Sequence, residues 1–273
     1  MTASSAPPAN AGAERIAAAF AAVRDGGRRA ALMPYLMGGF PDLETSRAIG
    51  EAYADGGADL VELGVPFSDP LADGPVIHEA GTRALAAGAT VDGVLGVARA
   101  LAPRLPVVLM CYANLVLARG VERFTAALAE AGGSGLIVPD LPFEEAPAVL
   151  EACDAAGLAL VPLVAPTTPD ERLARIGERA RGFLYTVSVT GTTGERTARD
   201  DAFADVVRRA RAATGVPVAL GFGISTPEQA AAAAAAGADG VIVGSRLVRE
   251  AAAAEDPPAA VRAVVAELAA ALR

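Results

Sequence analysis

The sequence predicts an α/β protein built as a single (β/α)8 TIM barrel with an additional N-terminal helix. Its 273 residues match the roughly 250 residues typical of one such barrel. Eight short apolar segments alternate along the chain with alanine-rich segments of helical length. The apolar segments are hydrophobic nearly throughout, as strands of a parallel sheet covered by helices must be.

The predicted strands are rich in β-branched and apolar residues. In chain order they span residues 32–37, 59–65, 106–113, 135–138, 159–165, 182–189, 217–222 and 240–243. An unbroken series of strand–helix units favours a closed barrel over an open doubly wound sheet. No GxGxxG sequence follows the first strand, which counts against a dinucleotide-binding fold.

The predicted helices carry apolar residues at helical spacing. They span residues 43–55, 121–131, 144–156, 169–180, 202–213 and 227–236, with the additional N-terminal helix at 13–24 and a last helix at 257–272. Thr226-Pro227-Glu228 shows a typical start signal, in which a capping hydroxyl precedes a first-turn proline and an acid. Residues 1–10 are predicted to be a disordered tail, and residues 11–273 to form one catalytic domain.

Composition narrows the classes of partner. The formal net charge is −9, which would repel nucleic acid, and the sequence shows no cluster of basic residues. No apolar run approaches the roughly 18 to 20 residues that a membrane helix needs. The first residues lack the basic and apolar regions of a secretion signal. We therefore expect a cytoplasmic protein that binds neither nucleic acid nor membrane.

Missing residue types restrict the chemistry. The sequence has no lysine, so all 23 basic residues are arginine, and His78 is its single histidine. Schiff-base catalysis and covalent anchoring of pyridoxal phosphate both require lysine and are therefore excluded. Metal sites built on two or three histidines are excluded as well, and we expect no metal. Cys111 and Cys153 lie in apolar segments and are expected to be buried thiols.

Glycines follow the last predicted strands. Strand seven ends in Gly221-Phe222-Gly223, strand eight is followed by Gly244-Ser245, and residues 191–194 form a third glycine-containing patch after strand six. Loops after strands seven and eight form the usual phosphate site of these barrels, and a helix that starts near Ser245 adds a favourable dipole. The alternative is that the glycines only end strands. Their combined placement predicts a phosphorylated small molecule as substrate.

Two carboxylates are the candidate catalytic groups. Glu62 lies among apolar residues near the end of strand two, where an ionisable group is costly unless it is paired or used. Burial should raise its pKa and suit it to proton transfer. Asp73 ends a loop long enough to fold back over the barrel mouth. The alternatives are a buried ion pair for Glu62 and ordinary turn chemistry for Asp73, while Tyr185 is either a substrate wall, a proton relay or core.

Residues 61–74, VELGVPFSDPLADG, closely resemble the signature of the tryptophan synthase alpha subunit family. Further segments resemble the same family and follow one another in the family's order. They are residues 110–115, 138–142, 185–194, 221–228 and 244–245. The resemblance covers nearly the whole chain apart from the tail. One departure is Thr192, where an apolar residue is expected, within the loop of 191–199.

The resemblance implies retro-aldol cleavage of indole-3-glycerol phosphate to indole and glyceraldehyde 3-phosphate. Glu62 falls on the general acid that protonates the ring carbon bearing the side chain, and Asp73 on the acid that meets the indole N–H. Thr193 falls on a loop threonine that, in the family, meets the strand-two aspartate when the site closes. The remaining implied substrate contacts are Tyr35, Tyr185 and Phe222 around the indole, and Gly194, Gly223, Gly244 and Ser245 at the phosphate.

The resemblance also implies a partner. In the family, the alpha subunit pairs with a beta subunit that carries pyridoxal phosphate, in an α2β2 heterotetramer, and no cofactor is expected in this chain. Pro66, Asp69 and Asn114 are the implied partner contacts. The alternatives are a stand-alone indole-3-glycerol phosphate lyase without a beta partner, a phosphosugar isomerase or epimerase, and a non-catalytic barrel that regulates a partner.

Overall fold

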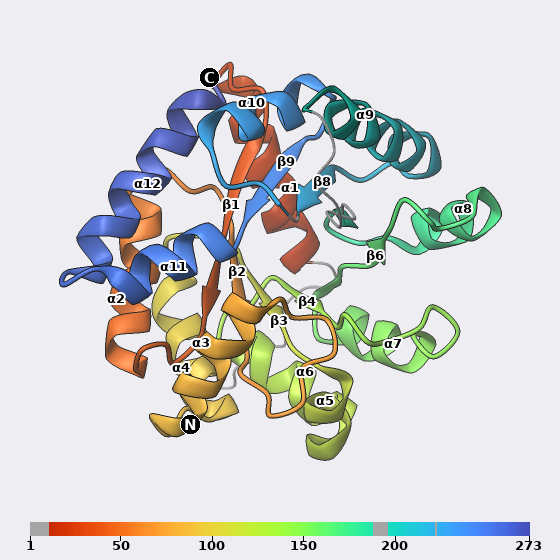
Figure 1. Cartoon of the computed structure of the whole chain (residues 1–273). Helices are drawn as coiled ribbons and strands as arrows, with labels where there is room; N and C mark the ends of the chain where they lie inside the picture. The colour runs from red at the N-terminus through yellow and green to blue at the C-terminus, as the bar shows by residue number, and fades with distance from the viewer. Residues whose placement is uncertain (1–10, 188–195, 222) are drawn as a thin grey trace.

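The computed structural model describes residues 11–187, 196–221 and 223–273 (Figure 1). Its strands are all parallel, in the order β5-β4-β3-β2-β1-β9-β8-β7-β6. They are β1 Ala31–Met37, β2 Val61–Gly64, β3 Val107–Met110, β4 Gly135–Ile137, β5 Ala159–Leu160, β6 Leu163–Val164, β7 Leu184–Val187, β8 Val218–Gly221 and β9 Gly240–Val243.

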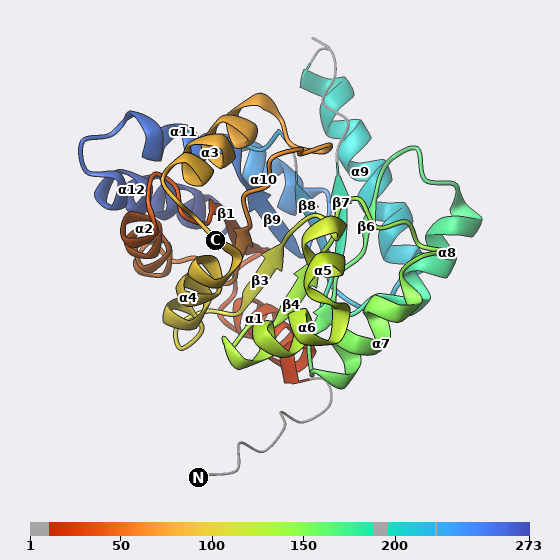
Figure 2. The same cartoon turned by 90° about the horizontal axis from the view of Figure 1, so that it is seen from below.

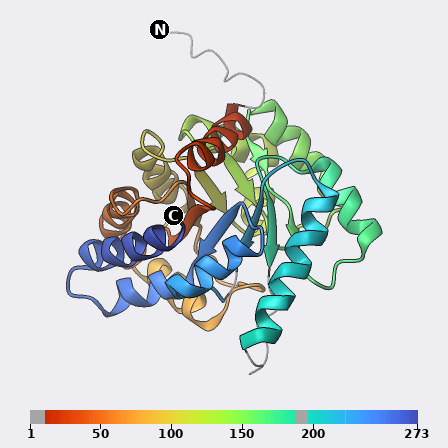
Figure 3. The ribbon, with the colours of Figure 1, turned by 90° about the horizontal axis from the view of Figure 1, so that it is seen from above.

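Helices surround these strands (Figure 3). They are α1 Ala11–Asp25, α2 Leu43–Asp55, α3 Pro75–Ala86, α4 Val91–Leu101, α5 Ala113–Arg119, α6 Val121–Glu130, α7 Pro147–Ala155, α8 Asp170–Arg179, α9 Arg196–Ala213, α10 Pro227–Ala235, α11 Ser245–Ala253 and α12 Pro257–Ala271. In the described part of the chain no single helix is long and apolar enough to cross a membrane, and only the pair α3 and α4, bent by 107°, passes on length and composition.

The two outermost strands in this order, β5 and β6, are consecutive in the chain. β5 and β6 are separated only by Val161 and Pro162. Val161 N donates to Leu136 O on the β4 side at 2.9 Å, while Pro162 O accepts from Tyr185 N on the β7 side at 3.0 Å. Pro162 has no N–H and cannot continue a regular ladder. β5 and β6 are therefore two halves of the fifth strand, and the predicted (β/α)8 barrel is confirmed.

Apolar side chains form one layer inside the barrel and another between strands and helices. α1 closes one end of the barrel, because Ile16 and Phe20 are buried in the inner layer and Phe20 lies 6.2 Å from the ring of Phe183. This is the predicted additional N-terminal helix. α3 lies at the opposite end (Figure 2). The carboxyl ends of the strands therefore surround the open end.

Two aspartates fix strand starts at the closed end. Asp59 accepts from Leu32 N and from Arg28 Nη1, both at 2.8 Å. Asp239 accepts from Val218 N at 2.9 Å and from Arg211 Nη1 at 3.0 Å. Each aspartate precedes one strand and accepts a hydrogen bond from an N–H group at the start of the adjacent strand. These backbone donors would otherwise have no partner at the end of the sheet.

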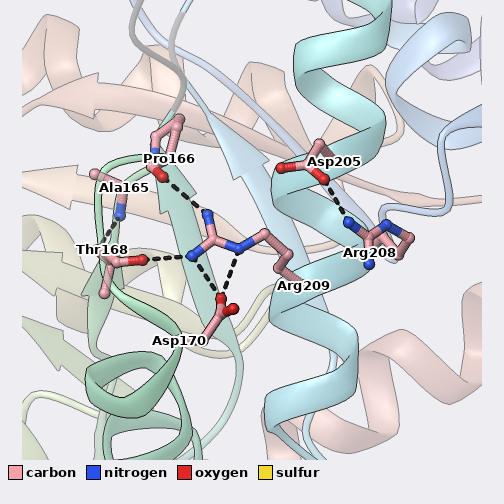
Figure 4. A network of polar contacts seen from close by, with 7 residues as sticks. All are labelled: Ala165, Pro166, Thr168, Asp170, Asp205, Arg208 and Arg209. Atoms are coloured by element: carbon pink, nitrogen blue, oxygen red, sulfur yellow. Dashed lines mark hydrogen bonds and ion pairs between the residues drawn. The ribbon is translucent and has the colours of Figure 1, made fainter.

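α9 is held by an arginine on its inner side. Arg209 Nε donates to Asp170 Oδ1 at 2.8 Å and Nη1 donates to Pro166 O at 2.9 Å, while Nη2 reaches Thr168 O (Figure 4). These contacts tie α9 to the segment between β6 and α8. The start of α8 and the C-terminal part of α9 are therefore tied together.

The structure has helices where the sequence analysis assigns none. α3 and α4 fill the connection between β2 and β3, and α5 begins where the third predicted strand was expected to continue. Gly88 ends α3 with a φ of +86°, and Thr90 caps α4 by accepting from Gly93 N at 3.1 Å. Frequent glycine in this stretch weakens the helical pattern. The predicted tail, residues 1–10, lies outside the described residues.

Candidate active site

A cavity of about 330 Å³ opens at the carboxyl ends of the strands. Side chains and backbone from β1, β2, β7, the β2–α3 loop and the start of α11 surround it. The structure thereby brings together most of the residues predicted to bind substrate or act on it: Tyr35, Glu62, Asp73, Tyr185, Gly223, Gly244 and Ser245. Thr193, Gly194 and Phe222 lie outside the described residues.

Glu62 is buried inside the barrel. It lies on β2 in register with Tyr35 on β1 and Val108 on β3, and it is 2% exposed. Its Oε2 has no hydrogen-bond partner among the described residues. Burial, followed by the charge of Asp73, raises its pKa from 4.5 to about 8. A carboxyl group in this state keeps its proton at neutral pH and can donate it to a bound molecule.

A buried ion pair was the alternative explanation for Glu62. No arginine is among the groups that shift its pKa. Glu62 lines the cavity, and its Oε2 has no partner among the described residues. The charged form is thus disfavoured rather than compensated. This environment is the opposite of what a structural ion pair provides.

Asp73 is held at the cavity by Tyr112, a residue that the sequence analysis missed. Tyr112 Oη donates to Asp73 Oδ1 at 3.0 Å and accepts from Ala72 N at 3.0 Å. The Tyr112 ring stacks on Phe67 with 5.3 Å between centroids. Both ends of the β2–α3 loop therefore rest on one side chain. Tyr112 lies within the segment 110–115 that resembles the family, but no local pattern marks its contact with Asp73.

Asp73 has a mixed electrostatic environment. Burial raises its pKa, while the Tyr112 hydrogen bond and the charge of His78 lower it. The same carboxylate contributes to the raised pKa of Glu62. Two neighbouring acids in different environments are the arrangement expected of groups with different tasks. Asp73 thus lines the cavity and accepts a hydrogen bond from Tyr112.

Two tyrosines form the wall of the cavity inside the barrel. Tyr35 and Tyr185 are buried, and burial raises the pKa of each hydroxyl well above 10. A Cβ at Gly64 would overlap Tyr35 Oη, and one at Gly221 would lie against the Tyr185 ring. Glycine on β2 and β8 therefore makes the space that the two rings occupy. Both hydroxyls remain protonated and neutral.

The opposite end of the cavity is built from backbone. Gly223, with a φ of +79°, follows β8, and Gly244 precedes α11 without a side-chain cap. Ser245 is the first residue of α11. The first N–H groups of a helix attract an anion. Arg246 and Arg249 also line this end, and neither was predicted.

The predicted partner contacts flank the mouth. Pro66 is buried, whereas Asp69 and Asn114 are exposed. Large apolar side chains lie in the same two segments: Leu71 in the β2–α3 loop is 84% exposed, and Leu117 in α5 is 61% exposed. Tyr112 connects the two segments through its contacts with Ala72 and Phe67. Leu71 and Leu117 thus expose apolar side chains in the two segments that carry the predicted partner contacts.

The cysteines are not part of this site. Cys111 and Cys153 are free, buried thiols, as predicted, and burial raises the pKa of both. Within the described ranges there is no group of three or more His, Cys, Asp or Glu residues that would hold a metal ion.

Comparison with known proteins identifies the family. The family model described as "Tryptophan synthase alpha chain" matches residues 20–272. The tryptophan synthase alpha chain of Prochlorococcus marinus (strain MIT 9313) is 52% identical over 228 residues, which is 83% of each chain. That of Acidiphilium cryptum (strain JF-5) is 50% identical over 270 residues, which is 95% of this chain and 97% of the relative.

Solved structures agree. A chain of Mycobacterium tuberculosis tryptophan synthase is 42% identical, with a TM-score of 0.87 over 95% of this chain and 98% of that one. A chain of the tryptophan synthase a2b2 complex from Pyrococcus furiosus is 37% identical, with a TM-score of 0.82 over 87% of this chain and 97% of that one. On sequence and structure alike, this chain belongs to the tryptophan synthase alpha chain family.

Proposed function

We propose that this chain cleaves indole-3-glycerol phosphate to indole and glyceraldehyde 3-phosphate through Glu62 and Asp73. As a member of its family, the chain is a lyase of tryptophan biosynthesis. The observation that carries the residue assignment is the shared cavity, in which a buried carboxyl with a pKa of about 8 lies beside a second carboxylate.

Glu62 starts the reaction as a general acid. Its proton goes to the indole ring carbon that bears the glycerol phosphate side chain, and the ring nitrogen becomes positively charged. Asp73 accepts the hydrogen bond of the indole N–H and stabilises this charge. Because Tyr112 fixes the Asp73 carboxylate, the stabilising charge is already in position before the proton moves.

The carboxylate left on Glu62 completes the cleavage. It takes the proton of the hydroxyl on the carbon attached to the ring, and a C=O bond forms there. The electron pair of the breaking C–C bond returns to the ring and neutralises the nitrogen. The protonated ring acts as the electron sink that an iminium group supplies in lysine-dependent aldolases, so a chain without lysine is sufficient.

Substrate orientation follows from the two ends of the cavity. Tyr35 and Tyr185 would contact the indole, together with Phe222. The backbone of Gly223, Gly244 and Ser245 at the start of α11 would bind the phosphate, with Gly194 and Thr193 completing the closed site. Binding both ends holds the reactive carbon near Glu62.

The alpha chain implies a beta-subunit partner, and the Pyrococcus furiosus neighbour comes from an a2b2 complex. We propose the same α2β2 assembly here, formed in the cytoplasm, with pyridoxal phosphate held only by the beta subunit. Pro66, Asp69 and Asn114 would contact the partner. The exposed side chains of Leu71 and Leu117 support this face, because they lie beside those residues.

Turnover of indole-3-glycerol phosphate by the purified chain, with and without its cognate beta subunit, tests the proposal. Glyceraldehyde 3-phosphate and indole are both quantified, and Glu62→Gln serves as the control that keeps the shape and removes the proton. We expect cleavage that increases with the beta subunit and is lost in the variant. Absence of turnover in both conditions would refute the reaction, and unchanged turnover on adding beta would favour the stand-alone lyase.

A further inference from the structure

Arg246 places a charged side chain at the phosphate end of the cavity. It is the second residue of α11, directly after Ser245, and it lines the cavity together with Gly223 and Gly244. The other groups at this end that are expected to meet the phosphate are uncharged. A guanidinium is the side chain best suited to binding a phosphate, because its planar donors match two of the oxygens.

The hydrogen-bonding capacity of Arg246 is only partly used. Its Nε is buried and has no hydrogen-bond partner among the described residues. Its Nη2 lies 3.3 Å from Glu250 Oε2, in a pair whose side chains are 42% and 32% exposed. A guanidinium carries five N–H donors, and a buried unpaired donor costs free energy. The side chain is therefore held at the cavity with donors to spare.

The position of Arg246 also runs against the helix dipole. α11 has no acidic residue in its first turn, and Gly244 supplies no side-chain cap. A cation in the first turn of a helix is unfavourable, because the N-terminus already carries partial positive charge. An anion bound at this point would offset both positive charges. Its described ion pair, with Glu250, is partly exposed to solvent, and a residue that breaks a local preference is expected at a functional site.

We infer that Arg246 binds the phosphate group of the substrate, together with the first N–H groups of α11. This inference rests on the proposed function only in taking the ligand to be a phosphate ester. The bound dianion accepts hydrogen bonds from the guanidinium, whose Nη2 also pairs with Glu250. Arg246 contributes to ground-state binding and stays away from the reacting carbon.

Binding of inorganic phosphate, measured by calorimetry, tests Arg246 without turnover. We expect Arg246→Gln to weaken phosphate binding about tenfold, as loss of a charge-assisted hydrogen bond does. Arg246→Lys, which keeps the charge and loses the planar fork, should show a smaller loss. Arg262→Gln, which removes an exposed arginine from α12, is the matched charge control and should bind like the wild type.

Kinetics separate this inference from the proposed function. With indole-3-glycerol phosphate, Arg246→Gln should raise KM about tenfold and leave kcat within about twofold, because binding is lost equally in ground and transition states. If the wild type cleaves nothing while phosphate binding still depends on Arg246, only the proposed reaction fails. If Arg246→Gln binds phosphate as tightly as the wild type, the inference about Arg246 is overturned.

Two further variants keep the test decisive. Glu250→Gln frees the guanidinium and should leave phosphate binding equal or tighter, and a loss as large as that of Arg246→Gln would overturn the inference. Arg249→Gln removes the exposed arginine one turn further along α11 and should cost less than Arg246→Gln. If Arg246→Gln and Arg249→Gln weaken phosphate binding equally, the effect is a general electrostatic attraction at the cavity mouth, and the inference is also overturned.

Discussion

Glu62 costs the folded protein free energy whenever it ionises, because its carboxyl is buried and its Oε2 has no described partner. The unfolded chain releases this proton near 4.5, whereas the folded chain keeps it to about 8. The unfolded state therefore binds fewer protons between these values. The contribution of Glu62 to stability is full below pH 4.5 and is lost as the pH rises to 8.

Glu62→Gln removes this penalty. We expect the variant to gain stability relative to the wild type as the pH rises from 5 to 8.5, by a few kcal/mol, since one pKa unit corresponds to about 1.4 kcal/mol. Urea unfolding at the two pH values measures the difference. A stability difference that does not change with pH would contradict the buried, protonated state of Glu62.

Tyr112→Phe removes the hydroxyl that donates to Asp73 and accepts from Ala72 N. We expect kcat/KM to fall about tenfold. Burial raises the pKa of Asp73 and the Tyr112 hydrogen bond lowers it, so the variant should move the acid limb of the pH profile to higher pH. Phe67→Leu, which keeps the hydroxyl and loses the stack, is the control and should leave that limb in place.

Site residues differed in how far the sequence predicted them. Glu62 was predictable because a lone acid in an apolar strand is conspicuous, and Asp73 because a long loop follows that strand. Tyr112 was not, because its role depends on a hydrogen bond across 39 positions. Arg246 resembled any arginine on a helix surface until the cavity placed it beside Gly223. Contacts between distant segments are not encoded in local pattern.

At the scale of elements, pairs of strands set the width of the cavity. Gly221 on β8 lies against the Tyr185 ring on β7, so the ring position depends on the absence of a side chain on the neighbouring strand. The glycine and the tyrosine therefore fix the position of the ring only as a pair. Cores respond to an extra methyl group by displacing side chains, at a typical cost of about 1–3 kcal/mol.

Gly221→Ala should therefore push Tyr185 into the cavity. We expect kcat/KM to fall at least tenfold and the free energy of unfolding to fall by about 1–3 kcal/mol. Steady-state kinetics and urea unfolding measure the two effects. The control is Gly96→Ala on α4, where a Cβ meets nothing within 4 Å and activity should not change. Equal activities of both variants would show that the Tyr185 position does not matter.

Elements were predicted where propensity and punctuation agreed. α10 begins with the Thr226 capping box and Pro227, and its start was predicted correctly. α3 and α4 were missed, because glycines interrupt the helical pattern in this stretch. The third strand was predicted to end at residue 113, whereas β3 ends at Met110, because the apolar residues that follow lead into α5 rather than extend the sheet. Apolar runs alone do not separate a strand from a buried helix.

At the scale of the whole molecule, the β2–α3 loop that carries Asp73 and the proposed partner face are connected through side-chain and backbone contacts. Tyr112 links Asp73 to the start of α5, and Asp140 Oδ1 accepts from Ala113 N at 2.8 Å. A partner that binds over Leu71 and Leu117 would therefore press on the segments that position Asp73. If the beta subunit binds there, as proposed, its ordering of this loop would be a route to mutual activation.

Leu117→Asp should weaken binding of the cognate beta subunit at least tenfold, because it replaces an exposed apolar contact with a charge. Turnover by the isolated chain should not change. Titration of the activity with beta subunit gives the affinity. Leu85→Asp, at the end of α3 and 38% exposed, is the matched control and should bind normally. Normal binding by Leu117→Asp would place the partner elsewhere.

Barrel closure was predicted from the count of strand–helix units, but its seam was not. Pro162 gives no local sign that the fifth strand changes neighbours, because a proline in an apolar segment is equally compatible with a strand end. The hydrogen bonds of Val161 and Pro162 to opposite sides of the barrel appear only in the closed structure.

The seam divides the sheet into β1–β5 and β6–β9, which also meet along the parallel ladder of Ala31–Pro34 with Gly240–Val243. A chain cut between Val161 and Pro162 thus loses one covalent bond and keeps its ladders. We expect two separately expressed fragments, 1–161 and 162–273, to assemble into one complemented enzyme. Size-exclusion chromatography and turnover of the mixture would measure this, and fragments that stay apart would show that the barrel needs an unbroken fifth strand.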